Sequence, residues 1–68
     1  MNIDISQYCF NDYRVVISAH GKVQGTRHMG ADTDAAVDLF QELNDSVFGL
    51  PVTVCLYNGN MLVDVDVH

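Results

Sequence analysis

Five acidic side chains lie close together in one short segment and form the densest group of chemically active residues in the sequence. The segment ADTDAAVDLFQELND contains no lysine or arginine, and its acids are Asp32, Asp34, Asp38, Glu42 and Asp45. On a helix, Asp34, Asp38 and Glu42 would be neighbours, because residues four positions apart lie on the same side. Such a row of carboxylates can be a solvated helix face, or it can bind a positively charged surface.

The apolar residues of this region favour a helix with one buried side. They recur at the spacings of three and four expected for a helix that packs on a core, and they are Ala36, Leu39, Phe40, Leu43 and Val47. Asp32 or Thr33 can cap the N-terminus, because either side chain accepts a hydrogen bond from the first turn. Gly49 and Pro51 are expected to end the helix.

Four further segments are rich in β-branched and aromatic residues and are predicted as strands. They are residues 13–19, 22–29, 52–57 and 60–67. The pairs His20-Gly21 and Asn58-Gly59 are expected to form the turns of two hairpins, because these residues tolerate positive φ; the second pair predicts a type I′ turn. Residues 2–6 are a candidate fifth strand.

The last predicted strand alternates between apolar and acidic residues. Its apolar set is Met61, Val63, Val65 and Val67. Asp64 and Asp66 point the opposite way, which is typical of a strand with one face on a core and one face in water. We therefore expect the valines to pack against Phe40 and Leu43 of the helix and the two aspartates to be solvated.

Length and composition limit the protein to one small folded unit. Of the 68 residues, 49% are hydrophobic, which is enough for a core and unlike a disordered acidic tail. We predict a single domain over residues 1–68 in the α+β class, with one helix packed on a four- to five-stranded antiparallel sheet in ββαββ order. Nine acids against three bases give a net charge of -6, which disfavours direct binding to nucleic acid.

The N-terminal residues and the hydropathy indicate neither export nor a membrane span. The stretch MNIDISQYCF lacks the charged and apolar regions of a signal peptide. No apolar run approaches the roughly 20 residues that a spanning helix needs. A soluble cytoplasmic protein is therefore expected, and in a reducing compartment Cys9 and Cys55 would be free thiols; the alternative is a disulfide between them.

The basic residues are as concentrated as the acidic ones. Arg14, Lys22 and Arg27 all fall in the first predicted hairpin, together with His20 and His28. One interpretation is that they pair with the carboxylates of the helix and neutralise part of the acidic surface. The alternative is that they form a site for an anion.

The segment GKVQG, residues 21–25, resembles the phosphate-binding loop of acylphosphatases, whose pattern is G-x-V-Q-G-V-x-F-R. The matching residues are Gly21, Val23, Gln24 and Gly25. Met29 stands where that family has its phosphate-binding arginine, and Asn58, a candidate for the family's asparagine, falls in the predicted hairpin turn. The resemblance implies an alternative function, a small phosphate-binding protein or acylphosphatase-like enzyme that uses Lys22 and Arg27.

No pattern typical of a metal centre or of a nucleophilic active site is present in the sequence. The possible metal ligands form neither a CxxC nor an HxxxH pair, and they are Cys9, His20, His28, Cys55 and His68. The serines lack the flanking glycines of a nucleophile elbow. We therefore predict that the protein is not an enzyme and uses no cofactor or metal.

These observations favour an acidic module that binds a basic protein or a nucleic-acid-binding complex. The predicted partner-binding residues are Asp34, Asp38, Glu42, Asp45, Asp64 and Asp66. In size, charge and strand order the chain is similar to small phage-encoded inhibitors such as anti-CRISPR proteins. That similarity implies a stoichiometric inhibitor that occupies a basic nucleic-acid-binding surface in the host cytoplasm. A further alternative is a structural homo-oligomer, for example a homodimer, that pairs exposed strand edges.

Overall fold

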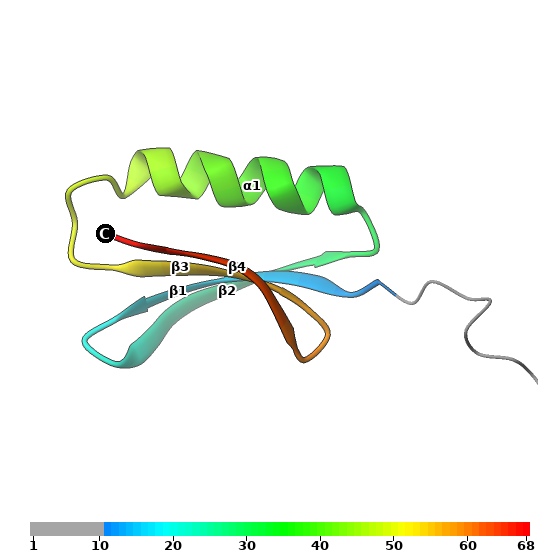
Figure 1. Ribbon diagram of the computed structural model, residues 1–68, viewed down its shortest axis with the longest axis horizontal. Coiled ribbons are helices and arrows are strands. Elements are labelled where there is room, and N and C mark those ends of the chain that lie inside the picture. The colour runs from blue at the N-terminus through cyan, green and yellow to red at the C-terminus, as the bar shows by residue number, and fades with distance from the viewer. Residues whose placement is uncertain (1–10) are drawn as a thin grey trace, which may run out of the picture.

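The computed structural model describes residues 11–68, which form one helix and four strands (Figure 1). The elements are β1 (Tyr13–Ala19), β2 (Lys22–Gly30), α1 (Thr33–Ser46), β3 (Thr53–Asn58) and β4 (Met61–Val67). This is the predicted α+β fold in ββαββ order, with an antiparallel sheet and one helix packed on it. The candidate fifth strand at residues 2–6 and the predicted free thiol of Cys9 lie outside the described residues.

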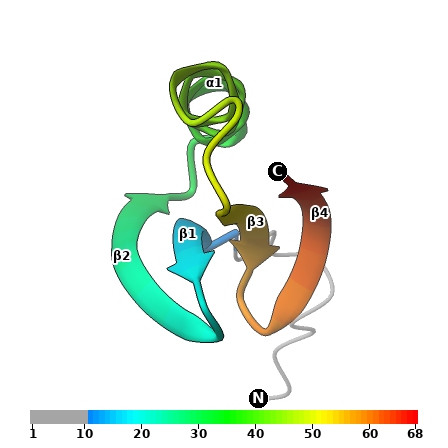
Figure 2. The ribbon, with the colours of Figure 1, turned by 90° about the vertical axis from the view of Figure 1, so that its left-hand side faces the viewer.

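The two hairpins lie side by side in a single sheet of order β2-β1-β3-β4. β1 and β3 are the central strands and pair antiparallel, so β2 and β4 are the two edges. The helix α1 runs over β1 and β3 on one face of the sheet (Figure 2). No element among residues 11–68 covers the other face, which we call the open face.

The first hairpin turn forms as predicted, and the second is displaced by one residue. His20 and Gly21 have φ of 54° and 75°, so both take the positive values that a type I′ turn requires. In the second hairpin, Asn58 is the last residue of β3, and Gly59, with φ of 60°, is the first residue of the turn. The type I′ turn predicted at Asn58-Gly59 is therefore wrong, because a glycine in first position favours type II′.

The helix begins where its capping residue predicts. The carboxylate of Asp32 accepts a hydrogen bond from the backbone N–H of Ala35 at 3.0 Å and so satisfies one of the free donors of the first turn. The helix ends at Ser46, and Gly49 follows with φ of 87° in the connection to β3. The last turn contains no basic residue, so no cationic side chain of the helix itself offsets the negative end of the helix dipole.

The core lies between α1 and the two central strands. Its buried members are Tyr13, Val15, Ala36, Phe40, Val54 and Leu56. Phe40 is 5% exposed and is the largest helix residue in this cluster. At the beginning of α1, Thr33 Oγ1 donates a hydrogen bond to the hydroxyl of Tyr13 at 3.1 Å, which ties the helix to β1.

The orientation predicted for the last strand is wrong over residues 64–67, while Val63 lies on the helix side as predicted. Asp64 pairs with Leu56 and Asp66 with Val54, and residues directly opposite in a ladder project to the same face, so both aspartates lie on the side of α1. Val65 instead lies on the open face and is 41% exposed. Alternation in a sequence shows that two faces differ, but it does not show which face is packed. The core lies between α1 and the central strands, and β4 is an edge strand. Val65 and Val67 are therefore not part of the core.

Candidate functional site

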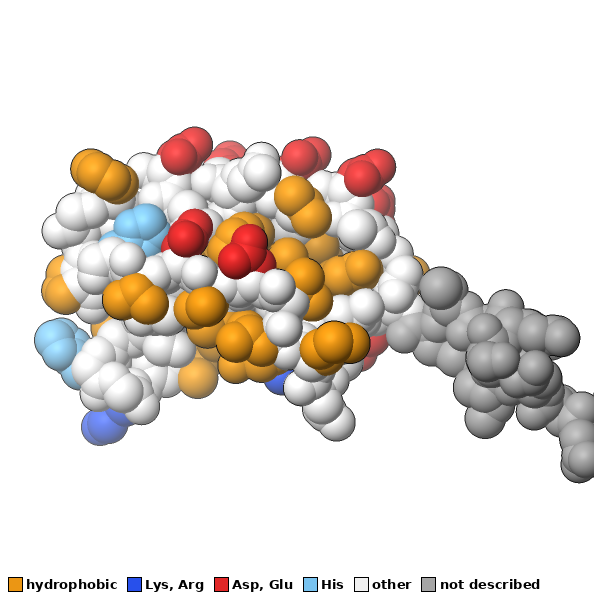
Figure 3. Space-filling view, viewed as in Figure 1, with side chains coloured by type: hydrophobic (Ala, Val, Ile, Leu, Met, Phe, Trp, Pro, Cys, Tyr) orange, Lys and Arg blue, Asp and Glu red, His pale blue; other side chains and the backbone are white. Residues whose placement is uncertain are grey.

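The outer side of α1 carries a row of carboxylates, Asp34, Asp38 and Glu42, on successive turns of the helix. All three side chains are exposed. Acidic side chains follow the helix along one edge of the molecule, and a second group lies nearer to β4 (Figure 3). Within residues 11–68, none of the row forms an ion pair with a lysine or arginine. The row is therefore a free negative surface in the described part of the chain.

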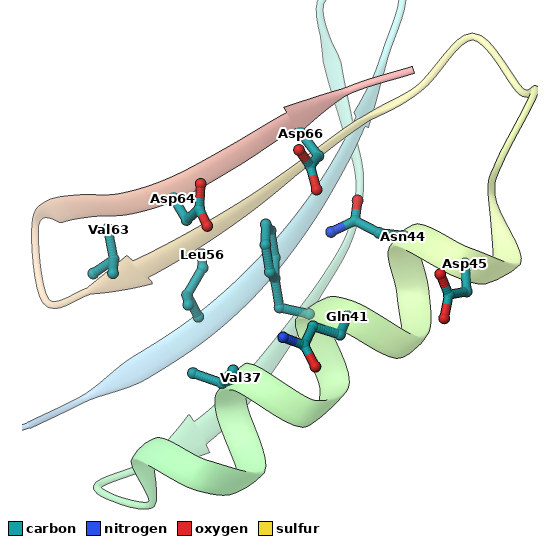
Figure 4. A pocket seen from close by; sticks show the side chains of 9 residues that line it. Val37, Gln41, Asn44, Asp45, Leu56, Val63, Asp64 and Asp66 are labelled. Atoms are coloured by element: carbon teal, nitrogen blue, oxygen red, sulfur yellow. The ribbon is translucent and has the colours of Figure 1, made fainter.

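A groove of about 360 Å³ separates α1 from β4 and collects the other predicted site residues. Asp64 and Asp66 extend from β4 toward the helix, and Asp45 lies at the helix side (Figure 4). Phe40 and Leu56 are among the apolar residues that line the groove between them. The structure thus places three carboxylates around an apolar floor, an arrangement that suits a cationic side chain with an aliphatic stem.

Asn44 is a site residue that the sequence analysis missed. It is 9% exposed, lines the groove, and its Oδ1 lies 2.7 Å from Nε2 of His68. The backbone N–H of His68 also donates to the carbonyl oxygen of Val52 at 2.9 Å. The first contact ties the residue after β4 to α1, and the second ties it to the residue before β3; together they hold this end of β4, which carries Asp66, in place. The sequence did contain a signal for a buried Asn44. This residue follows Ala36 and Phe40 at intervals of four, which places a polar side chain on the buried side of the helix.

Replacing His68 with alanine is expected to destabilise the fold by about 1 kcal/mol, because the buried amide of Asn44 loses its hydrogen-bond partner. Urea unfolding followed by circular dichroism measures the change. The double variant Asn44→Leu/His68→Ala should recover part of the loss, because it removes both polar partners. An unchanged midpoint for the single variant would contradict this role for His68.

The basic residues do not neutralise the acidic helix. Arg14 donates from Nη1 to the carbonyl oxygen of Gly59, and its guanidinium carbon lies 4.4 Å from the centroid of the Tyr57 ring. Arg27 lines a second groove on the other side of α1, of about 180 Å³, which Leu39 also lines. The predicted pairing of these cations with the helix is therefore absent among residues 11–68.

The described residues contain no arrangement typical of metal binding or of phosphate binding by a loop. No group of three or more histidine, cysteine, aspartate or glutamate residues between 11 and 68 is placed to hold a metal ion. In the GKVQG segment, Gly21 belongs to the hairpin turn and the following residues are part of β2. Asn58 is not in the turn, and its Oδ1 accepts from the backbone N–H of Asp12 at 3.0 Å. Over the same residues, no helix is long and apolar enough to cross a membrane.

Fold and site together define a small α+β domain with an acidic helix face and an acidic groove beside it. Comparison with known proteins found no matching family model, curated protein or solved structure.

Proposed function

We propose that this protein is a stoichiometric binding module that docks its acidic side on a basic surface of another protein. The observation that carries the proposal is that the carboxylates of α1 and of the groove are exposed and have no basic partner within the described chain. The proposed contact residues are Asp34, Asp38, Glu42, Asp45, Asp64 and Asp66.

The chemistry of such a contact follows from the two parts of the surface. Exposed carboxylates attract a basic partner over several ångströms and raise the rate of encounter, an effect that salt weakens. At the groove, the stem of a lysine or arginine can lie on Phe40 and Leu56 while its charged end reaches Asp64 or Asp66. A nucleic-acid-binding protein offers many such side chains, because its surface is built to neutralise phosphates. Inhibition of a complex of this kind in the cytoplasm, as by anti-CRISPR proteins, is the activity we propose.

The experiment reverses the charge of α1 by the quadruple substitution Asp34→Lys, Asp38→Lys, Glu42→Lys and Asp45→Lys. Wild-type protein immobilised on a resin is first used to capture a partner from the source cell, and the partner is then purified. Titration calorimetry should show that the quadruple variant binds this partner at least about a hundredfold more weakly, a loss of roughly 2.7 kcal/mol. The wild-type affinity should also fall steeply with salt.

The control adds positive charge elsewhere. Val23→Lys/Gln24→Lys changes two exposed residues of β2 and should leave the affinity for the partner within about threefold of wild type, or roughly 0.7 kcal/mol. Unchanged affinity and unchanged salt dependence in the quadruple variant would refute the proposal. Circular dichroism establishes that each variant is folded.

A further inference from the structure

The two edge strands carry opposite charges on the same face of the sheet. Asp64 and Asp66 of β4 lie on the side of α1, as the pairing with β3 shows. On β2, Arg27 pairs with Val15, a core residue beneath α1, so its guanidinium also leaves the sheet on the helix side. β2 and β4 flank the helix on its two sides (Figure 2), and each lines one of the two grooves. One edge is thus acidic and the other basic.

Both edges are open to pairing in the part of the chain that the structure describes. The strand order leaves one side of β2 and one side of β4 without a neighbour among residues 11–68. All of β4 is exposed, and in β2 every residue except Met29 is exposed. An edge strand with free N–H and C=O groups is a template on which another strand can pair. Val23, Val65 and Val67 add exposed apolar surface along the open face of these edges.

We propose that the occupant of these edges is a second copy of this chain, with β4 of one copy paired to β2 of the next. Neighbouring strands alternate in direction across the order β2-β1-β3-β4, so β4 runs opposite to β2. When the helices of both copies lie on the same face, the new pair is therefore antiparallel and continues the sheet. Arg27 of one copy then lies opposite or diagonal to Asp64 and Asp66 of the other, within the reach of cross-strand pairs.

Charge selects this head-to-tail pairing over the two symmetric ones. Two β4 strands would place Asp64 and Asp66 against the same residues of the other copy, and like charges opposite one another in a ladder are destabilising. Two β2 strands would bring together Lys22 and Arg27 from both copies. Of the three possible edge pairings, only that of β4 with β2 brings opposite charges together. Such an interface is asymmetric, so the copies form a closed ring or a chain.

The assembly leaves the outer side of α1 uncovered, because the helix lies over the central strands and the new contacts form at the outer sides of β2 and β4. The inference therefore does not rest on the proposed function, although both proposals use Asp64 and Asp66. In the assembled form Asp64 and Asp66 face the neighbouring copy, and a basic partner would be held by the carboxylates of α1.

A charge exchange between the two edges tests the proposal. One variant carries Asp64→Lys/Asp66→Lys, which makes both edges basic, and the other carries Lys22→Glu/Arg27→Glu, which makes both edges acidic. In sedimentation velocity experiments, the wild type should be larger than a monomer, and each variant alone should associate at least about tenfold more weakly. An equimolar mixture of the two variants should regain the wild-type assembly. When the variants alternate, each interface pairs a basic edge strand of one variant with an acidic edge strand of the other.

The control is Asp34→Lys/Asp38→Lys, which raises the net charge from -6 to -2, as Asp64→Lys/Asp66→Lys also does, but leaves both edges intact. This control should assemble like the wild type. Circular dichroism spectra show that the variants are folded. A monomeric wild type would overturn the proposal, and so would a mixture that stays monomeric. If the Lys22→Glu/Arg27→Glu variant by itself assembled like the wild type, the interface would not involve β2 and the proposal would also be wrong.

Discussion

Replacing Phe40 with alanine is expected to leave the protein largely unfolded at room temperature. Phe40 is 5% exposed and belongs to the cluster in which α1 packs on β1 and β3. Truncation of a buried phenylalanine to alanine costs about 3–5 kcal/mol. Folded proteins have roughly 0.05–0.15 kcal/mol of stability per residue, so this cost is comparable to the whole stability of so small a domain. Loss of the far-ultraviolet circular dichroism signal of the helix measures the effect.

Phe48→Ala is the matched control for this prediction. Phe48 is 83% exposed, and its ring makes an edge contact with His68 at a centroid distance of 6.4 Å. The same chemical change should therefore alter the free energy of unfolding by less than about 1 kcal/mol. If the two variants unfolded at the same urea concentration, the assignment of Phe40 to the core would be contradicted.

Local signals in the sequence were sufficient to predict most of the fold. The apolar spacing of α1 and the Asp32 cap are properties of a single element, and both are confirmed. The His20-Gly21 turn is likewise set by the two residues that form it. These features could be predicted because each depends on neighbours in the chain.

The features that could not be predicted depend on contacts between distant segments. The strand order makes β4 an edge, and that order is fixed by the pairing of β1 with β3 rather than by the residues of β4. A register shift beside Leu56 also interrupts the alternation of β4. The role of Asn44 depends on His68, which is distant from it in the sequence.

In the candidate site, too, the features set by local sequence were predictable and those set by contacts between distant segments were not. The row Asp34, Asp38 and Glu42 was predictable, because helical spacing alone places these residues together. The groove was not predictable, because it exists where β4 lies beside α1 with its aspartates turned toward the helix. The distribution of the cations was also set by tertiary structure, since Arg14 lies over Tyr57 and forms no ion pair with the helix carboxylates in the described part of the chain.

The double substitution Asp64→Val/Asp66→Val is expected to raise the free energy of unfolding by about 2 kcal/mol, because two aliphatic side chains would bury apolar surface in the groove, whose lining includes Val37 and Val63. Urea unfolding measures the change, at a protein concentration at which sedimentation shows the variant to be monomeric. That condition matters because association between copies would add to the measured stability.

The converse variant, Val65→Asp/Val67→Asp, distinguishes the two orientations of β4. In the observed register these valines are 41% and 78% exposed on the open face, so their replacement should lower stability by no more than about 1 kcal/mol. In the orientation expected from the alternation, the same change would bury two charges and unfold the protein. In that orientation Asp64→Val/Asp66→Val would change residues on a solvated face and would have little effect on stability. The changes in the free energy of unfolding of the two double variants, taken together, therefore show which face of β4 packs against α1.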